Sequence, residues 1–339
     1  MNVLLSAVGR RAYLVEYFQQ ALAPCGGKVV AANATMDATG MLTADVAELL
    51  PLAKSPEYID AMLAVCKRHA IKLLFSLHDW EAPYIARARE RFLEIGTTPV
   101  MPSSDVMNIC LDKFKMFEQM NRLGIPTPRT YLDRAAAERE LTFPMIVKPR
   151  LGQGSLGLFK VNTPDELAWA YQLSQSVTES FSVDAAVADC EMPNVLVQEC
   201  IAGDEYGCDI VNDLQGNFVT AFVKRKLAMR AGETDVAVTV EEPRIVECAR
   251  AIAAWSRHPG IMDTDFFLDR EGKAWLLEMN PRFGGGYPFS HVAGADLPAA
   301  CVAWASGRVP DEAWLRVRPG VRAYKDILML AEKGMRHGH

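Results

Sequence analysis

AWLLEMNPRFGGG, residues 274–286, begins as an apolar run of strand length and ends in a proline and three glycines, which break regular structure. In an extended chain, side chains two residues apart point the same way, so Glu278, Asn280 and Arg282 project from one face. Two oxygen ligands beside a fixed cation suit a magnesium ion chelated by a polyphosphate, and the guanidinium suits the charge on a transferring phosphoryl group. The alternative is a strand whose polar end lies in solvent.

The strand before this stretch is predicted to pair with it through a turn at residues 270–273. That hairpin brings Asp265 close to Glu278. Two like charges so near each other are costly unless a metal compensates, so we expect a metal site made of Asp265, Glu278 and Asn280. Asp263 competes with Asp265 for the metal, and we favour Asp265 because the other two ligands need a partner on the same face.

Composition and charge limit the function. At 339 residues the chain is expected to form two or three subdomains. A net charge of -6 disfavours nucleic acid or an anionic membrane as the main partner, and the short basic cluster at residues 224–226 does not change that. No apolar run approaches the roughly 20 residues of a membrane span. Eight scattered cysteines favour a reducing cytoplasm over a disulfide framework or a zinc site.

The N-terminus is predicted to form a parallel α/β layer, from a strand at residues 2–7, a helix at 12–23 and a strand at 28–33. Arg10 and Arg11 follow the first strand. Because they follow the short apolar run instead of preceding it, the N-terminus does not resemble a signal peptide. A dinucleotide site is also excluded, since a single glycine marks the first turn.

Charged residues lie where two strands of this layer end. Arg10 and Arg11 lie at the carboxyl end of the first strand, where such sheets bind ligands, and can hold an anionic substrate. A surface pair is the alternative. Asp79 and Glu81 follow the strand at residues 71–77 and can hold an amine; helix capping and first-turn charge are the alternative.

Lys113 has an unusual position. Residues 103–124 predict a helix, a break and a second helix, with Ser104 capping the first and Asp112 the second. Lys113 then lies in the first turn of the second helix, where a cation opposes the helix dipole. That position suits a phosphate ligand.

A glycine-rich segment at residues 150–157 follows a short strand that carries Lys148 near its end. The segment lacks the G-K-[ST] of a P-loop, and a strand follows it where a P-loop has a helix. A hairpin whose backbone N–H groups fold over phosphates fits better, and a plain turn is the alternative. Beyond it, residues 174–193 are polar and low in pattern, which predicts a flexible insertion.

Two acidic residues accompany the next pair of predicted strands. Glu199 follows a strand at residues 195–198, and Glu205 opens the following one. One of them can meet the amino edge of adenine while the other accepts from ribose hydroxyls. Ordinary edge-strand charges are the alternative.

Taken together, these motifs resemble the ATP-grasp superfamily, in particular the smaller proteins similar to one half of the carbamoyl-phosphate synthetase large chain. The resemblance implies a fold of α/β and α+β type, with a parallel α/β domain at residues 1–102 before a two-lobed ATP-grasp domain. Linker helices and a lid lobe would occupy residues 103–197, and a lobe with the Mg/ATP site residues 198–339. The residues that carry it are Asp112, Lys113, Ile146–Pro149, Gly152–Gly157, Gln198, Glu199, Glu205, Asp265 and Glu278–Arg282.

The resemblance also implies roles. ATP would be bound by Lys113, Lys148, Gly152, Gln153, Gly154, Ser155, Gly157, Gln198, Glu199, Ile201 and Glu205, with the glycine-rich hairpin as a lid. Magnesium, with manganese as a substitute, would be held by Asp265, Glu278 and Asn280. Arg282 and Lys148 would act on the phosphoryl group, and Arg230 would face the reacting carboxylate.

The implied reaction is the activation of a carboxylate by ATP, which gives an acyl phosphate that an amine or ammonia attacks. Small-molecule substrates are expected, and dimerisation is common among similar proteins. The mixed charge of Arg10, Arg11, Asp79 and Glu81 suits an amino acid or another zwitterion. A non-catalytic nucleotide-binding regulatory subunit is the alternative function. His291 is a candidate base, but its surroundings predict the start of a packed helix.

Overall fold

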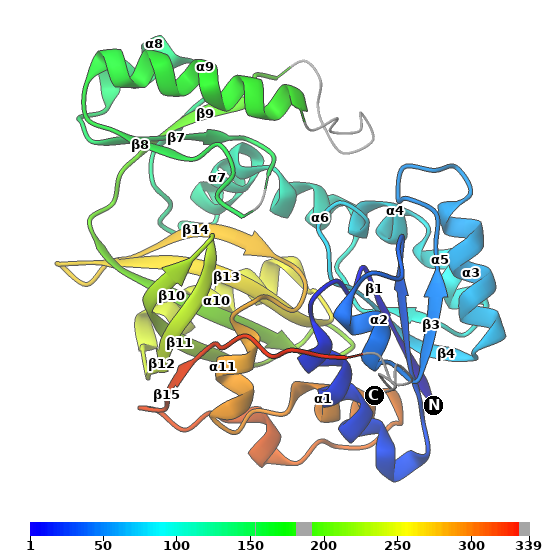
Figure 1. Ribbon diagram of the computed structural model, residues 1–339. Helices are drawn as coiled ribbons and strands as arrows, with labels where there is room; N and C mark the ends of the chain where they lie inside the picture. The colour runs from blue at the N-terminus through cyan, green and yellow to red at the C-terminus, as the bar shows by residue number, and fades with distance from the viewer. Residues whose placement is uncertain (153, 181–191, 332–339) are drawn as a thin grey trace, which may run out of the picture. The chain divides into compact units, whose positions relative to one another are not determined.

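The computed structural model describes residues 1–152, 154–180 and 192–331 (Figure 1). Contacts between residues divide the chain into two compact units. The first holds residues 1–100, 296–315 and the chain from 323 on, and the second holds residues 101–295 and 316–322. Each unit is described by itself.

The first unit is built on a parallel sheet, as the sequence predicted. Its strands stand in the order β3-β2-β1-β4-β5, and every pairing is parallel. They are β1 (Asn2–Ser6), β2 (Val29–Asn33), β3 (Val46–Leu49), β4 (Ile71–Ser76) and β5 (Thr98–Pro99). β1 lies at the centre, and because both faces of the sheet are covered, its residues from Val3 on are buried.

Helices of the first unit come from both ends of the chain. They are α1 (Ala12–Leu22), η1 (Ala23–Cys25), α2 (Thr39–Thr43), α3 (Tyr58–Arg68), α4 (Ala82–Arg87), α5 (Arg89–Glu94), α12 (Leu297–Ala305) and η2 (Glu312–Leu315). α12 packs against α1. Its residues from Leu297 to Ala303 are all buried, as expected of a helix that is apolar all round. Residues 296–315, which the sequence assigned to the segment 198–339, therefore group with the N-terminal sheet.

The second unit contains two sheets. The smaller has the order β6-β9-β7-β8 and is antiparallel. Its strands are β6 (Thr130–Tyr131), β7 (Met145–Pro149), β8 (Phe159–Val161) and β9 (Val195–Glu199). The helices α8 (Arg134–Glu140) and α9 (Pro164–Ser180) lie beside it (Figure 1). Their apolar side chains pack with those of the sheet. The flexible insertion predicted for residues 174–193 does not begin at residue 174, because α9 continues to Ser180. Residues 181–191 lie outside the described residues.

Two short helices precede this sheet, α6 (Ser104–Leu111) and α7 (Lys113–Arg122). The cap of α6 is Ser103, whose hydroxyl accepts from the N–H of Val106, and not Ser104 as predicted. Asp112 caps α7 as predicted, because its carboxylate accepts from two N–H groups of the first turn.

The larger sheet has the order β14-β13-β10-β11-β12-β15. Its strands are β10 (Gly203–Asn212), β11 (Phe218–Arg230), β12 (Glu233–Thr239), β13 (Gly260–Asp269), β14 (Ala274–Asn280) and β15 (Arg322–Tyr324). The helix α10 (Pro243–Ser256) buries Ile245, Ala249 and Ile252 against one face, and α11 (Tyr287–Val292) follows the glycines after β14. His291 lies near the end of α11 and not at its start. None of the described helices is long and apolar enough to cross a membrane.

Candidate functional site

The β13–β14 hairpin has the predicted register. Asp265 lies directly opposite Glu278, and Asp263 lies opposite Asn280. Cross-strand partners share a face, and so do residues two apart on a strand. All four side chains therefore lie on one face of the sheet. The argument that preferred Asp265 over Asp263 by face is thus wrong, since both aspartates lie on that face.

The surroundings do distinguish the two aspartates. Asp265 and Glu278 line a cavity, whereas Asp263 packs against the backbone of Gly284, where an added Cβ would lie 2.1 Å from a carboxylate oxygen. Burial, followed by the nearby charges of Asp265 and Asp209, raises the pKa of Asp263 to about 7. Asp265 is therefore the better placed of the two to meet a ligand in the cavity.

The cavity has a volume of about 400 Å³ and collects most of the predicted nucleotide residues. The nucleotide residues that line it are Lys113, Lys148, Gly152, Gly154, Ser155, Gln198 and Glu205, and two predicted metal ligands, Asp265 and Glu278, line it as well. Apolar residues from both sheets of the unit complete the wall, namely Ile146, Leu156, Leu158, Met229, Phe267 and Leu277. A pocket with apolar walls and a few convergent charges is the usual form of a small-molecule site.

Both predicted phosphate lysines reach the cavity. The Lys113 ammonium donates to the carbonyl of Gly152 at 2.6 Å and lies 3.3 Å from Glu278 Oε1. Lys148 is buried and donates to Gln198 Oε1 at 2.9 Å. Burial, followed by repulsion from Lys113, lowers the pKa of Lys148 to about 8, against the attraction of Glu278. Each lysine carries a charge that the phosphates of a nucleotide can pair.

Lys226 belongs to the site and the sequence analysis missed it. Its Nζ lies 2.7 Å from Glu205 Oε1 and 2.7 Å from Asp265 Oδ1. Although burial alone would lower it, these two carboxylates raise the pKa of Lys226 above its usual value. The signal was that Lys224 and Lys226 alternate on β11, where the register, which sets Lys224 opposite Gly207, puts them on the same face as Glu205 and Asp209 of β10.

These ammonium groups change one inference. The closeness of Asp265 and Glu278 does not by itself require a metal, because Lys226 and Lys113 already compensate the two carboxylates. Among the described residues, no group of three or more His, Cys, Asp or Glu side chains could hold a metal ion. The predicted ligand set of two carboxylates and the amide of Asn280 remains chemically suited to magnesium, which prefers oxygen donors.

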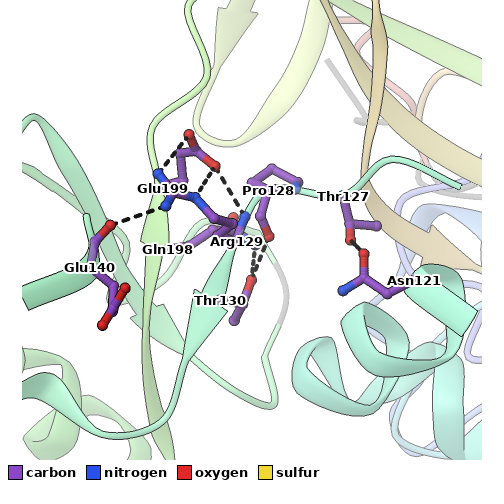
Figure 2. A network of polar contacts seen from close by, with 8 residues as sticks. All are labelled: Asn121, Thr127, Pro128, Arg129, Thr130, Glu140, Gln198 and Glu199. Carbon is purple, nitrogen blue, oxygen red and sulfur yellow. Dashed lines mark hydrogen bonds and ion pairs between the residues drawn. The ribbon is translucent and has the colours of Figure 1, made fainter. Parts of the chain in front are cut away.

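Glu199 does not line the cavity. Successive side chains of a strand point to opposite faces, and Gln198 is the one that faces the cavity. The Glu199 carboxylate pairs instead with the guanidinium of Arg129, at 3.2 Å from Nε and 3.3 Å from Nη2, and that guanidinium also donates to the carbonyl of Glu140 (Figure 2). Of these two predicted residues, Gln198 is therefore the one whose side chain can reach a ligand in the cavity.

Other predicted residues lie outside the cavity wall. Arg230 ends β11 and pairs with Asp235 at 2.9 Å, and Arg282 Nη1 donates to the Phe283 carbonyl at 3.3 Å. The turn after Arg230 does reach the glycine-rich segment, since a Cβ on Gly232 would lie 2.8 Å from the Gly154 carbonyl oxygen. Asn280, Gly157 and Ile201 are also absent from the wall, and Gln153 lies outside the described residues.

The two predicted acidic substrate residues of the first unit are both buried. Glu81 is buried, and its Oε2 accepts from Ser6 Oγ at 3.0 Å and from the Tyr58 hydroxyl at 2.6 Å. Burial raises the pKa of Glu81. Glu81 stands at the N-cap position of α4, but its side chain makes no capping hydrogen bond. Asp79 is buried as well.

The two predicted arginines differ in their environment. Arg11 donates from Nη1 to the carbonyl of Leu77, at the end of β4, whereas Arg10 is exposed. Arg11 therefore ties two strand ends of the parallel sheet together. Arg10 keeps the surface position that the sequence left as its alternative.

Comparison with known proteins agrees with this geometry. A family described as "PylC-like, N-terminal domain" matches residues 3–100, and one described as "ATP-grasp in the biosynthetic pathway with Ter operon" matches residues 191–325. A D-alanine–D-alanine ligase of Pseudomonas entomophila is 30% identical over 51% of this chain and 54% of its own length. The vancomycin/teicoplanin A-type resistance protein VanA of Enterococcus faecium is 27% identical over 51% of this chain and 52% of its own. The chain thus spans about half the length of these curated relatives.

Solved structures extend the likeness of fold over nearly the whole chain. An L-amino acid ligase from Bacillus licheniformis superposes with a TM-score of 0.73 at 20% identity, covering 97% of this chain and 81% of that one. A biotin carboxylase from Campylobacter jejuni gives 0.72 at 19% identity, covering 93% and 73%. The chain thus has the fold of these solved proteins, with a parallel N-terminal sheet, two further antiparallel sheets and a lysine-lined cavity, and its residues 191–325 match an ATP-grasp family.

Proposed function

We propose that this protein is an ATP-dependent ligase that joins a carboxylate to an amine or ammonia. The observation that carries the proposal is the single cavity in which two lysines, a glycine-rich loop and two facing carboxylates meet. The named relatives include ligases, which supports turnover over the alternative of a regulatory nucleotide-binding subunit.

The reaction would proceed in two steps. A carboxylate oxygen of the substrate attacks the γ-phosphorus of ATP, and the bond to the bridging oxygen breaks to release ADP. The amine nitrogen then attacks the acyl phosphate, and inorganic phosphate leaves as the C–N bond forms. Such chemistry depends on alignment and on charge neutralisation more than on an enzyme nucleophile.

The residues of this chain divide the work. Lys113 and Lys148 would pair with the phosphates, and the glycine-rich loop would cover them with backbone N–H groups. Asp265, Glu278 and Asn280 would hold magnesium, with manganese as a substitute; the ion neutralises phosphate charge when bound. Glu205 would accept from ribose hydroxyls and Arg282 would stabilise the phosphoryl group during transfer.

The names of the relatives suggest the substrate class. The similar ligases are named for D-alanine and for L-amino acids, which supports a small amino-acid-like substrate here. The cytoplasm remains our proposed location, since the described cysteines are all free thiols. We also propose a homodimer, on the sole ground that dimerisation is common among similar proteins.

A direct assay tests the proposal. The purified chain is incubated with Mg-ATP and pools of amino acids and other small carboxylates, and ADP and phosphate are measured with and without added amine. We expect ADP release that depends on the substrate pool, with a coupled product visible by mass spectrometry. Nucleotide binding without substrate-stimulated ADP release across the pools would favour the regulatory subunit instead.

A further inference from the structure

A chain of hydrogen bonds fixes the side-chain amide of Gln198. Thr130 and Gln198 are direct cross-strand partners on β6 and β9, and both side chains are buried. Gln198 Nε2 donates to Thr130 Oγ1 at 2.9 Å, and that hydroxyl donates to the carbonyl of Pro128 at 2.9 Å. On the other side, Lys148 Nζ donates to Gln198 Oε1 at 2.9 Å. Figure 2 shows Thr130 and Pro128 beside Gln198.

This arrangement allows one orientation of the amide. A hydroxyl has a single proton, and because Thr130 uses it for the Pro128 carbonyl, Thr130 can only accept from Gln198. The amide nitrogen must therefore face Thr130. A reversed amide would place NH₂ against the Lys148 ammonium, donor against donor, and oxygen against an oxygen that has no proton left. Both neighbours thus turn the carbonyl oxygen of Gln198 to the side of Lys148.

The same face of the small sheet forms part of the cavity. Ile146 is the direct cross-strand partner of Gln198, and Lys148 follows two residues later on the same strand. All three residues line the cavity. A flat aromatic base can pack on the isoleucine and offer its edge to the amide oxygen. That oxygen accepts hydrogen bonds and donates none, so it matches the 6-amino group of adenine and opposes the 6-oxo group of guanine.

We propose that Thr130 is a positioning residue that sets the preference of this site for ATP over GTP, by holding the Gln198 amide with its oxygen toward the base. The inference rests on the proposed function, because it takes the cavity as the nucleotide site. Thr130 itself makes no contact with the base. It acts through Gln198: because its hydroxyl donates to the Pro128 carbonyl, it can only accept a hydrogen bond from the Gln198 amide.

The test compares Thr130→Val with Thr130→Ser. Valine keeps the shape of threonine and removes the hydroxyl, whereas serine keeps the hydroxyl. The probes are Mg-ATP and Mg-GTP, and their dissociation constants are measured by calorimetry on the full chain. For Thr130→Val we expect the ratio of the GTP to the ATP constant to fall by about tenfold, the usual worth of one hydrogen bond. Thr130→Ser should keep the wild-type ratio.

A second variant removes the amide itself. Gln198→Met should lose the preference for ATP, and adding Thr130→Val to it should change the ratio no further, because Thr130 then has nothing to orient. If Thr130→Val fails to fold, Thr130→Ala replaces it, both as the single variant and in the double variant with Gln198→Met, so the inference stays testable.

Each other outcome is informative. If Thr130→Val weakens both nucleotides equally, Thr130 only supports packing and the inference is overturned. An additive effect in the double variant would overturn it as well, and so would a wild type that binds ATP and GTP equally. A wild type that binds neither nucleotide contradicts the proposed function itself.

Discussion

The Arg150 guanidinium and the Asp112 carboxylate form an ion pair with Nη1 3.2 Å from Oδ2, and their side chains are 0% and 3% exposed. Asp112 also caps α7 through Oδ1, and the N–H of Lys113 donates to the Arg150 carbonyl at 3.2 Å. The pair therefore joins the start of α7 to the start of the glycine-rich loop. Lys113 and that loop are held together at the point where both would meet phosphate.

Arg150→Met is expected to lower the free energy of unfolding of the second unit by about 3–5 kcal/mol, because it leaves the Asp112 charge buried without its partner. Urea unfolding followed by tryptophan fluorescence measures the loss. Adding Asp112→Asn should recover part of it, since the double variant leaves no unpaired charge. The matched control in the same unit is Arg225→Met, which breaks an exposed pair with Asp204 and should cost less than about 1 kcal/mol. Equal losses for both arginines would contradict the role of burial.

Glu278→Gln is expected to reduce turnover roughly 10²–10³-fold, by analogy with the removal of one electrostatic stabiliser. The amide keeps the shape of the side chain but removes the charge that faces Asp265 and Lys113. ADP release at saturating Mg-ATP measures the effect. Glu271→Gln, in the exposed turn of the same hairpin, is the control and should stay at the wild-type rate. A Glu278→Gln rate close to wild type would remove Glu278 from the metal site.

The affinity for Mg-ATP should fall as the pH rises through about 8, the pKa to which burial lowers Lys148 in the free protein. Below that pH the lysine is charged and can pair with phosphate, whereas above it a proton must be taken up on binding, at a cost of up to about tenfold in affinity for each pH unit. Dissociation constants measured between neutral and alkaline pH test this. Lys148→Arg keeps its charge over that range, so its profile should be flat. A flat wild-type profile would show that Lys148 stays charged.

Acid should destabilise the second unit through His258. This side chain is fully buried, with Ser256 Oγ 2.8 Å from Nδ1 and the Ile210 carbonyl 3.2 Å from Nε2, and burial lowers its pKa to about 4 from 6.5. Between those two values the unfolded chain binds a proton that the folded one does not, so stability falls as the pH falls through that window, by about 3 kcal/mol in all. Unfolding free energies at several pH values measure the slope. His258→Gln should show a shallower slope, and an unchanged slope would assign the acid sensitivity to carboxylates alone.

The sequence predicted those parts of the site that depend on local geometry. The facing of Asp265 and Glu278 followed from a short turn and the period of a strand, and Lys113 was found because it opposed its own helix dipole. What it missed depends on contacts distant in sequence. Lys226 reaches Glu205 and Asp265 only because of the register that pairs β11 with β10. The Glu199 carboxylate is held by Arg129, which lies 70 residues earlier in the sequence, directly before β6.

The same limit applies to the fold. The parallel order of the first sheet followed from alternating strands and helices, whereas the return of α12 to α1 is a contact between the two ends of the chain. No local pattern encodes such a contact. Glu81 shows the converse, since a carboxylate at the end of a parallel sheet suggested a ligand but is held by Ser6 and Tyr58 within the core.

Lys113 pairs with Glu278 and Lys226 pairs with Asp265, so the carboxylates at the cavity already form ion pairs with lysines of the protein. A divalent ion that binds alone to the carboxylates would leave the lysine ammonium groups without an anion. A nucleotide that binds alone to the lysines would leave the carboxylates without a cation. Metal and nucleotide arriving together can exchange partners with both sets at once, so each should bind far more tightly in the presence of the other.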